Sequence, residues 1–135
     1  MKYTVITLIV MGVLLPLGIS LATIPRLRFS ENPDIMEQEI LRVIPPGTPI
    51  AKAKKIMERN LFKCEYGENK MVSRYRKVPG TSVPEETYFG RVDRLMCRRS
   101  KQYKGYPVTQ DWIVAIIHEN GFVTTLVVNY GLTGP

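Results

Sequence analysis

The longest apolar run of the chain lies at its beginning, where residues 3–25 contain no charged side chain. A helix needs about 20 apolar residues to span a bilayer, so this run predicts a membrane anchor over residues 3–24. It also has the layout of a secretory signal, with Lys2 before the apolar part and a small-x-small site that ends at Ala22. We expect residues 1–25 to form an anchor or signal helix. We favour the uncleaved anchor over a secreted product cleaved near Ala22.

Basic residues flank this run on both sides. Arg26 and Arg28 follow it, and the positive-inside tendency disfavours export of the side that carries them. An export-type start favours the opposite outcome. We expect the rest of the chain to lie outside the cytoplasm, and the arginines keep the inside orientation open.

Two short amphipathic segments come next, each with signals for a helix start. Asn32 suits an N-cap and Pro33 a first helical position, and a Pro-Pro-Gly stop follows at residues 45–47. Thr48 is expected to cap the second helix and Pro49 to open it. The apolar positions at helical spacing are Met36, Ile40 and Val43 in the first helix, and Ile50, Ala53, Met57 and Leu61 in the second.

After Asn60 the pattern becomes extended. A turn is expected at Gly67-Glu68-Asn69, a loop at residues 79–86 and a basic connection at residues 100–107. Gly90 predicts a β-bulge. The expected extended segments are residues 61–66, 71–78, 88–99, 111–118 and 121–130.

Asn120-Gly121 between the last two segments predicts a two-residue β-hairpin turn. From this turn we expect one face, beneath the helix over residues 49–61, to carry Ile113, Ala115, Ile117, Phe122, Leu126 and Val128. The other face would carry Trp112, Val114, Ile116 and Val127. That face is apolar as well, which predicts a second cover or a partner.

The order of these elements predicts an α+β fold. An N-terminal apolar signal or anchor helix precedes two short helices that pack on an antiparallel β-meander, in an ααβββ-like order. We expect the signal or anchor over residues 1–25, a linker with a short helix over residues 26–46, and one α+β domain over residues 47–131.

Charge is concentrated in the middle of the chain. Residues 42–104 hold sixteen Lys and Arg but six Asp and Glu, a net charge of +10. Such a segment fits an acidic protein, anionic lipid, cell-wall polymer or nucleic acid, and it also fits a merely solvated face. We expect its densest part, together with Trp112 on the second apolar face, to bind the partner: Arg94, Arg98, Arg99, Lys101, Tyr103 and Lys104. Basic residues interleaved with tyrosines are typical of single-strand binding, but the export-type start argues against nucleic acid.

Cys64 and Cys97 are the two cysteines of the chain. A pair of cysteines in an exported domain predicts a disulfide. If the domain is cytosolic, buried free thiols are expected instead.

The residues that carry catalysis elsewhere do not form a set here. His118 is the single histidine, and Glu119 beside it points to the opposite face of a strand. One histidine and two cysteines fall short of the four ligands of a structural zinc site. We therefore expect no enzyme activity, no metal, no cofactor and no small-molecule substrate.

From about residue 46 to residue 129 the chain resembles a known family of small exported domains, the BamE/SmpA proteins and the related β-lactamase-inhibitor-like fold. Several short stretches carry this resemblance. They are Pro46-Gly47-Thr48-Pro49 opening a helix through Met57, the extended Phe62-Lys63-Cys64, and the segments Trp112–His118 and Val123–Asn129. The resemblance implies a domain that binds other proteins at the cell envelope, as scaffold or inhibitor. The chain differs from that family in lacking a lipid-attachment cysteine and in having the basic segment Arg98–Lys104.

These observations predict a membrane-anchored or secreted, small, non-catalytic binding domain. We expect it to engage another protein at the cell envelope, through acidic groups of that protein. The alternative is a basic module that binds anionic lipid, cell-wall polymer or nucleic acid.

Overall fold

The computed structural model describes residues 24–134. The anchor or signal helix expected over residues 1–25 therefore lies almost entirely outside the described residues. Within the part of the chain that is described, no helix is both long enough and apolar enough to cross a membrane.

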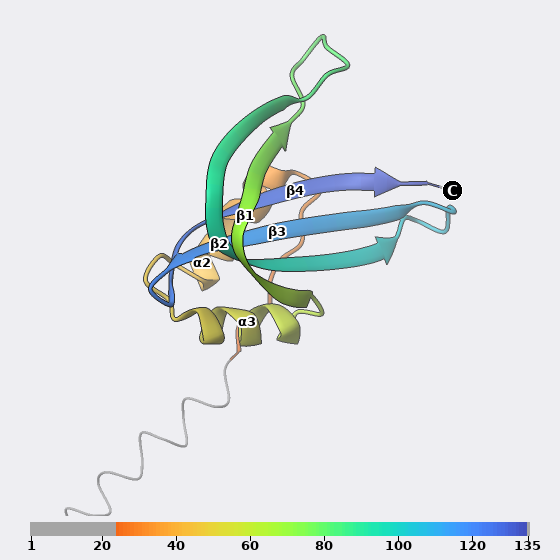
Figure 1. Ribbon diagram of the computed structural model, residues 1–135. Coiled ribbons are helices and arrows are strands. Elements are labelled where there is room, and N and C mark those ends of the chain that lie inside the picture. Colours follow the sequence, from red (N-terminus) through yellow and green to blue (C-terminus); the bar gives the residue numbers. More distant parts are fainter. Residues whose placement is uncertain (1–23, 135) are drawn as a thin grey trace, which may run out of the picture.

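The fold is α+β, with two helices and one antiparallel sheet of four strands (Figure 1). The strands follow one another in the sheet as β1-β2-β3-β4, so the sheet is a meander. The elements are α2 (Pro33–Val43), α3 (Ile50–Arg59), β1 (Lys63–Arg76), β2 (Glu85–Gln102), β3 (Thr109–Glu119) and β4 (Phe122–Thr133).

The first predicted helix is confirmed as α2. The side chain of Asn32 accepts hydrogen bonds from two backbone N–H groups of the first turn, at 2.9 and 3.3 Å. These N–H groups have no partner inside the helix, so the cap stabilises its start. Met36 and Ile40 point into the core, followed by Ile44 just beyond the helix, and all three are fully buried.

Helix α3 begins without the predicted cap. The Thr48 hydroxyl donates to the carbonyl of Pro45 at 2.6 Å instead of capping the helix. The N–H of Ile50 donates to the carbonyl of Gly121 at 2.9 Å. The β3–β4 turn thus provides the partner that the sequence pattern assigned to a threonine side chain.

Leu61 does not extend the apolar stripe of α3. The helix ends before it, and Leu61 lies in the left-handed backbone region (φ 67°) with 71% of its surface exposed. The next residue, Phe62, occupies the core position instead and is 3% exposed. The helix itself buries Ala53, Ile56 and Met57.

Strand β1 joins the first two predicted extended segments. The turn predicted at residues 67–69 is wrong, because the pairing with β2 only shifts register between Gly67 and Lys70 and then continues. A local irregularity of this kind bends a strand without ending it. The element order is therefore ααββββ rather than the ααβββ order expected.

Strand β2 bends at the predicted bulge. Gly90 has a φ of 81°, and the register of β1 shifts between Val72 and Ser73, opposite it. Only the part of β2 from Asp93 onward pairs with β3. The first part leaves the sheet together with the end of β1, and these two strands form an arch that rises from β3 and β4 (Figure 1).

The predicted hairpin turn between β3 and β4 is confirmed. Asn120 and Gly121 both have positive φ, at 53° and 82°, and Glu119 pairs with Phe122. Positive φ at both central residues is what a type I′ turn requires, and asparagine followed by glycine adopts it readily.

The two faces of β3 are opposite to those predicted, whereas Leu126, Val127 and Val128 of β4 lie on the faces predicted for them. The residues on the helix side are Trp112, Val114, Ile116, Leu126 and Val128, and those on the far side are Ala115, Ile117 and Val127. Both faces of β3 are apolar, so the alternation alone did not decide which one meets the helices. In addition, the pairing of β3 with β4 shifts by one residue between Ile117 and His118. Relative to β3, the residues of β4 after Thr124 therefore point to the face opposite to the one that strict alternation from the turn would give them.

The stretch predicted as a linker with a short helix, residues 26–46, is part of the same core. Leu27 is 7% exposed and its N–H donates to the Asn60 side chain at 2.9 Å. Phe29 packs edge-on against Trp112, with ring centroids 5.2 Å apart. Together with α2, this stretch covers the helix side of the sheet.

A buried ion cluster joins the end of β1 to the outer edge of β4. The carboxylate of Glu37 in α2 accepts hydrogen bonds from Arg74 and Arg76, and from the backbone N–H of Val128 at 3.1 Å. Arg76 also donates to the carbonyl of Val128 at 2.8 Å. The N–H and the carbonyl of Val128 both point away from β3, at the open edge of the sheet. The ion cluster therefore supplies the hydrogen-bond partners that a further strand would otherwise provide.

The side chain of Asn129 makes a second link between β1 and β4. It accepts from the N–H of Tyr75 at 2.8 Å and donates to the carbonyl of Ser73 at 2.9 Å. One amide side chain of β4 therefore makes the pair of hydrogen bonds to β1 that the backbone of a neighbouring strand would otherwise make. The arch is held over the sheet by this amide and by the ion cluster.

Candidate binding surface

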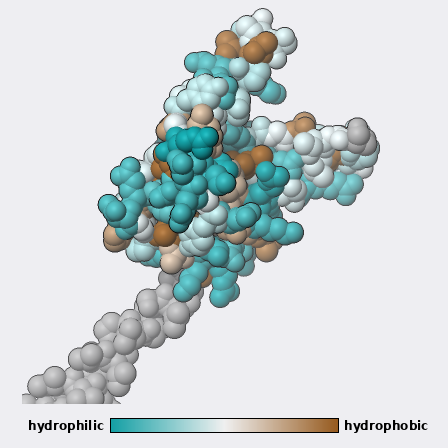
Figure 2. Space-filling view, viewed as in Figure 1, coloured by the Kyte–Doolittle hydropathy of each residue, from teal (hydrophilic) through white to brown (hydrophobic). Residues whose placement is uncertain are grey.

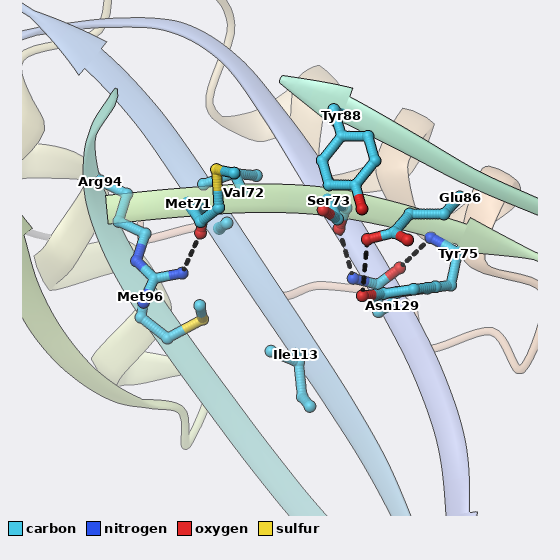
Figure 3. Close-up of a pocket in the computed structure, with 11 residues that line it drawn as sticks. Met71, Val72, Ser73, Tyr75, Glu86, Tyr88, Arg94, Met96, Ile113 and Asn129 are labelled. Atoms are coloured by element: carbon cyan, nitrogen blue, oxygen red, sulfur yellow. Dashed lines mark hydrogen bonds between the residues drawn. The ribbon is translucent and has the colours of Figure 1, made fainter. Parts of the chain in front are cut away.

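A groove of about 470 Å³ lies between the arch and the sheet, on the side away from the helices. We call it the arch groove (Figure 3). Its lining comes from all four strands and consists of Met71, Val72, Ser73, Tyr75, Glu86, Tyr88, Arg94, Met96, Ile113, Ala115 and Asn129.

The floor of the arch groove is apolar. It is part of a second hydrophobic cluster in which Val72, Ala115 and Val127 are buried and Met96 is partly buried. The sequence predicted a second apolar face, but of the residues assigned to it only Val127 belongs to this cluster. The other three, Trp112, Val114 and Ile116, lie on the helix side. The arch covers part of the second cluster and leaves the groove open.

The rim carries large, exposed side chains. Met71 is 51% exposed, Tyr75 47% and Tyr88 64%. Figure 2, viewed as Figure 1, shows hydrophobic residues in the angle between the arch and the hairpin of β3 and β4, with hydrophilic residues around them. Tyrosine, methionine and arginine are enriched where proteins meet, and a groove of this kind suits a side chain of a partner.

A carboxylate organises the tyrosines of the rim. The Tyr75 hydroxyl donates to Glu86 at 2.9 Å (Figure 3). This hydrogen bond lowers the pKa of Glu86 and raises the pKa of Tyr75. Hydrogen bonding to the same carboxylate raises the pKa of Tyr88. At neutral pH Glu86 is therefore ionised and both tyrosines keep their protons.

Arg94 brings positive charge to the other side of the groove. Its Nη1 donates to the carbonyl of Met71 at 2.9 Å, which fixes the side chain across β1 and β2 (Figure 3). A guanidinium has five N–H donors, and this bond uses one of them. The described part of the chain shows no further hydrogen bond from this guanidinium, so its other N–H groups can meet a carboxylate of a partner.

The basic residues predicted as one contact region do not lie together. Arg94 and Arg98 are on the groove side of β2, at alternate positions with buried Leu95 and Cys97 between them on the helix side. Arg99 is on the helix side, where its guanidinium lies 4.1 Å from the ring centre of Phe29. Lys101 is exposed on the helix side. Tyr103 and Lys104 belong to the β2–β3 turn, where the Lys104 ammonium lies 5.1 Å from the centre of the Tyr103 ring.

Trp112 is not available as a contact residue. It is 3% exposed, and its indole N–H donates to the carbonyl of Ser30 at 2.8 Å. The prediction failed because it placed Trp112 on the face away from the helices, whereas this residue lies beneath the segment before α2.

His118 is half-buried. Its ring packs edge-on against that of Tyr66, with the ring centroids 6.3 Å apart. Its Nε2 is buried and has no hydrogen-bond partner within residues 24–134.

Cys64 and Cys97 lie directly opposite each other in β1 and β2. Their sulfur atoms are 2.7 Å apart. The two thiols are therefore close together, but no disulfide joins them in this structure.

A second hollow of about 510 Å³ lies at the start of α2, between that helix and the ends of β1 and β4. Glu31 and Asp34 line it together with Arg76 and Lys77, so its charges are mixed. Over residues 24–134 no three His, Cys, Asp or Glu side chains come close enough together to hold a metal ion.

Comparison with known proteins finds no family model, no curated protein and no solved structure that matches this chain.

Sequence reasoning missed most of the arch groove. Tyr75 and Tyr88 were read only as strand residues, because nothing in their spacing showed that the arch folds over β3. Two signals pointed in this direction: the glycine at position 90 and a β3 segment that is apolar on both faces.

Proposed function

We propose that this chain is a small, non-catalytic binding domain of the cell envelope that engages another protein through the arch groove. Residues 1–25 would hold it at the membrane, or direct its export before cleavage near Ala22. The uncharged run at residues 3–25 supports this location.

The observation that carries the proposal is the chemistry of the groove. Val72 and Ala115 form an apolar floor that is itself buried. The apolar surface that reaches solvent lies on the rim above it, at Met71, Tyr75 and Tyr88. Apolar surface that stays exposed in a small domain costs free energy in water, about 25 cal/mol for each Å². A partner that covers it recovers that free energy, which is how interface hot spots arise.

The charge on the Arg94 side of the groove, opposite ionised Glu86, favours a partner segment with an apolar side chain next to a carboxylate. Arg94 lines the groove and exposed Arg98 continues along the same face. The whole chain has a net charge of +7. Attraction to an acidic partner should speed association and weaken with added salt.

The alternative, binding of anionic lipid, cell-wall polymer or nucleic acid, draws its support from the same net charge. The predicted basic residues divide between two faces and a turn, which gives a polyanion no single surface to follow. We therefore assign the basic residues a steering role around the groove.

A matched pair of variants tests the proposal. The groove variant carries Met71→Ser, Tyr75→Ser and Tyr88→Ser. The control variant carries Leu61→Ser, Tyr66→Ser and Tyr106→Ser, which removes one aliphatic side chain and two tyrosines of similar exposure elsewhere. Each tagged protein is used to capture partners from solubilised host envelope at low and high salt.

We expect one protein to be captured by the wild type and the control, to be lost from the groove variant, and to be captured less at high salt. Equal capture by all three proteins, with native circular dichroism, would refute the groove. Sedimentation with vesicles containing phosphatidylglycerol, unchanged in the groove variant, would favour the polyanion alternative. The N-terminus of the protein from its host, at Met1 or near Thr23, distinguishes anchor from signal.

A further inference from the structure

We propose that Cys64 and Cys97 join in an intramolecular disulfide, and that Cys64 is the thiol that reacts first. This proposal is independent of the arch groove, because both residues lie on the helix side of the sheet.

The strand register supplies the geometry. The two cysteines are directly paired in β1 and β2. Opposite residues of antiparallel strands have Cα atoms about 4.5–5.5 Å apart, which lies inside the range that a disulfide requires. The sulfur atoms already face each other at 2.7 Å, so no strand has to move for the bond to form.

The surroundings of the two sulfurs differ, and this difference sets the order of reaction. Cys97 is 0% exposed and belongs to the core between the sheet and α3. Cys64 is on the outer strand β1 and is only partly buried. An external oxidant can therefore reach Cys64 but not Cys97.

The acidity of the thiols agrees with this order. The hydrogen bond between the two sulfurs lowers the pKa of Cys64, against the opposing effect of its burial, and Lys54 on α3 adds to the lowering while Glu58 opposes it. The same contact, together with burial, raises the pKa of Cys97. The thiolate is the reactive form of cysteine, so Cys64 is also the better nucleophile.

The reaction with a small disulfide such as oxidised glutathione then has two steps. The Cys64 thiolate attacks one glutathione sulfur, forms a mixed disulfide and releases one glutathione thiolate. Cys97 loses its proton and attacks the Cys64 sulfur, which releases the second glutathione. Two protein thiols are oxidised, and one glutathione disulfide is reduced to two thiols.

The order can be measured on the purified, reduced full chain incubated with oxidised glutathione. The wild type should lose two hydrogens in mass and keep no glutathione. The variant Cys97→Ser should stop with one glutathione on Cys64. The variant Cys64→Ser should add glutathione to Cys97 at least about tenfold more slowly, because its thiol is buried and less acidic.

Local unfolding of a variant could expose Cys97, so both single variants are also tested in concentrated urea. There the difference in rate between them should largely disappear. Equal rates of the folded variants would overturn the order of reaction. A wild-type product that carries glutathione on each cysteine, or unchanged thiols, would overturn the disulfide itself.

Discussion

Replacing Glu37 by glutamine should open the link between β1 and β4. Within residues 24–134, Glu37 is the one carboxylate that binds both Arg74 and Arg76, and it also accepts the N–H of Val128 at the edge of β4. Glutamine keeps the size of the side chain and one acceptor oxygen. The change therefore removes the negative charge and leaves the packing of α2 nearly intact.

The magnitude follows from how deeply the cluster is buried. Removing one partner of a buried ion pair typically costs 3–5 kcal/mol, because the other charge stays desolvated. The Glu37 side chain is 9% exposed, but those of Arg76 and Arg74 are 18% and 28% exposed. Water can therefore solvate the guanidiniums in part, and we expect a loss of about 2–3 kcal/mol.

Urea unfolding followed by the fluorescence of Trp112 measures this loss. The control is Glu39→Gln, which breaks an ion pair with Arg42 one turn further along α2; the arginine side chain is 59% exposed and the glutamate side chain 14%, so water reaches the pair from the arginine side. An exposed pair of this kind contributes at most about 1 kcal/mol. A loss for Glu37→Gln no larger than that for Glu39→Gln would refute the role assigned to the cluster.

Three further predictions concern other parts of the fold. Asn32→Ala should lower the free energy of unfolding by about 1 kcal/mol, because α2 loses its N-cap acceptor; an unchanged urea midpoint would contradict this. Asp111→Asn should lower it by about 0.5–1 kcal/mol at pH 7, because hydrogen bonds from Ser100 and Thr133 lower the pKa of Asp111. That difference should shrink as the pH falls below about 4, the ordinary pKa of the carboxyl, and a constant difference down to strongly acidic pH would contradict it. Reduction of the proposed disulfide should cost about 3–4 kcal/mol, since it joins residues 33 apart; reductant should have no effect on a Cys64→Ser, Cys97→Ser double variant, and an equal effect on both proteins would count against the bond.

Local signals along the chain predicted most of the elements. Asn32 and Pro33 marked the start of α2, Asn120-Gly121 marked the β3–β4 turn, and Gly90 marked the bulge, because each of these residue types suits one backbone conformation. Such signals act within a few residues of one another, so a single sequence is enough to read them.

The features that failed depend on contacts between distant segments. The partner of the α3 N-terminus is the carbonyl of Gly121, far along the chain from Thr48, which local reasoning chose instead. Which face of β3 meets the helices depended on an extra residue in β4 near Thr124, and alternation does not show it.

The candidate site depended on distant contacts as well. The arch groove exists because Asn129 and the Glu37 cluster hold the end of β1 over the sheet. Nothing near Tyr75 or Tyr88 in the sequence records that contact. The basic residues were easier to see, because charge is visible in composition, but composition does not tell on which face of a strand each residue lies.

Site-specific photo-crosslinking in the host tests the central claim most directly. A photoreactive phenylalanine derivative replaces Tyr88 at the rim of the arch groove in one strain, and replaces Tyr106 in the β2–β3 turn in another; the two residues are 64% and 61% exposed. If the groove binds a protein of the envelope, irradiation should join the Tyr88 probe to one discrete protein and leave the Tyr106 probe without that product. The absence of any adduct at Tyr88, or the same adducts from both positions, would contradict the account.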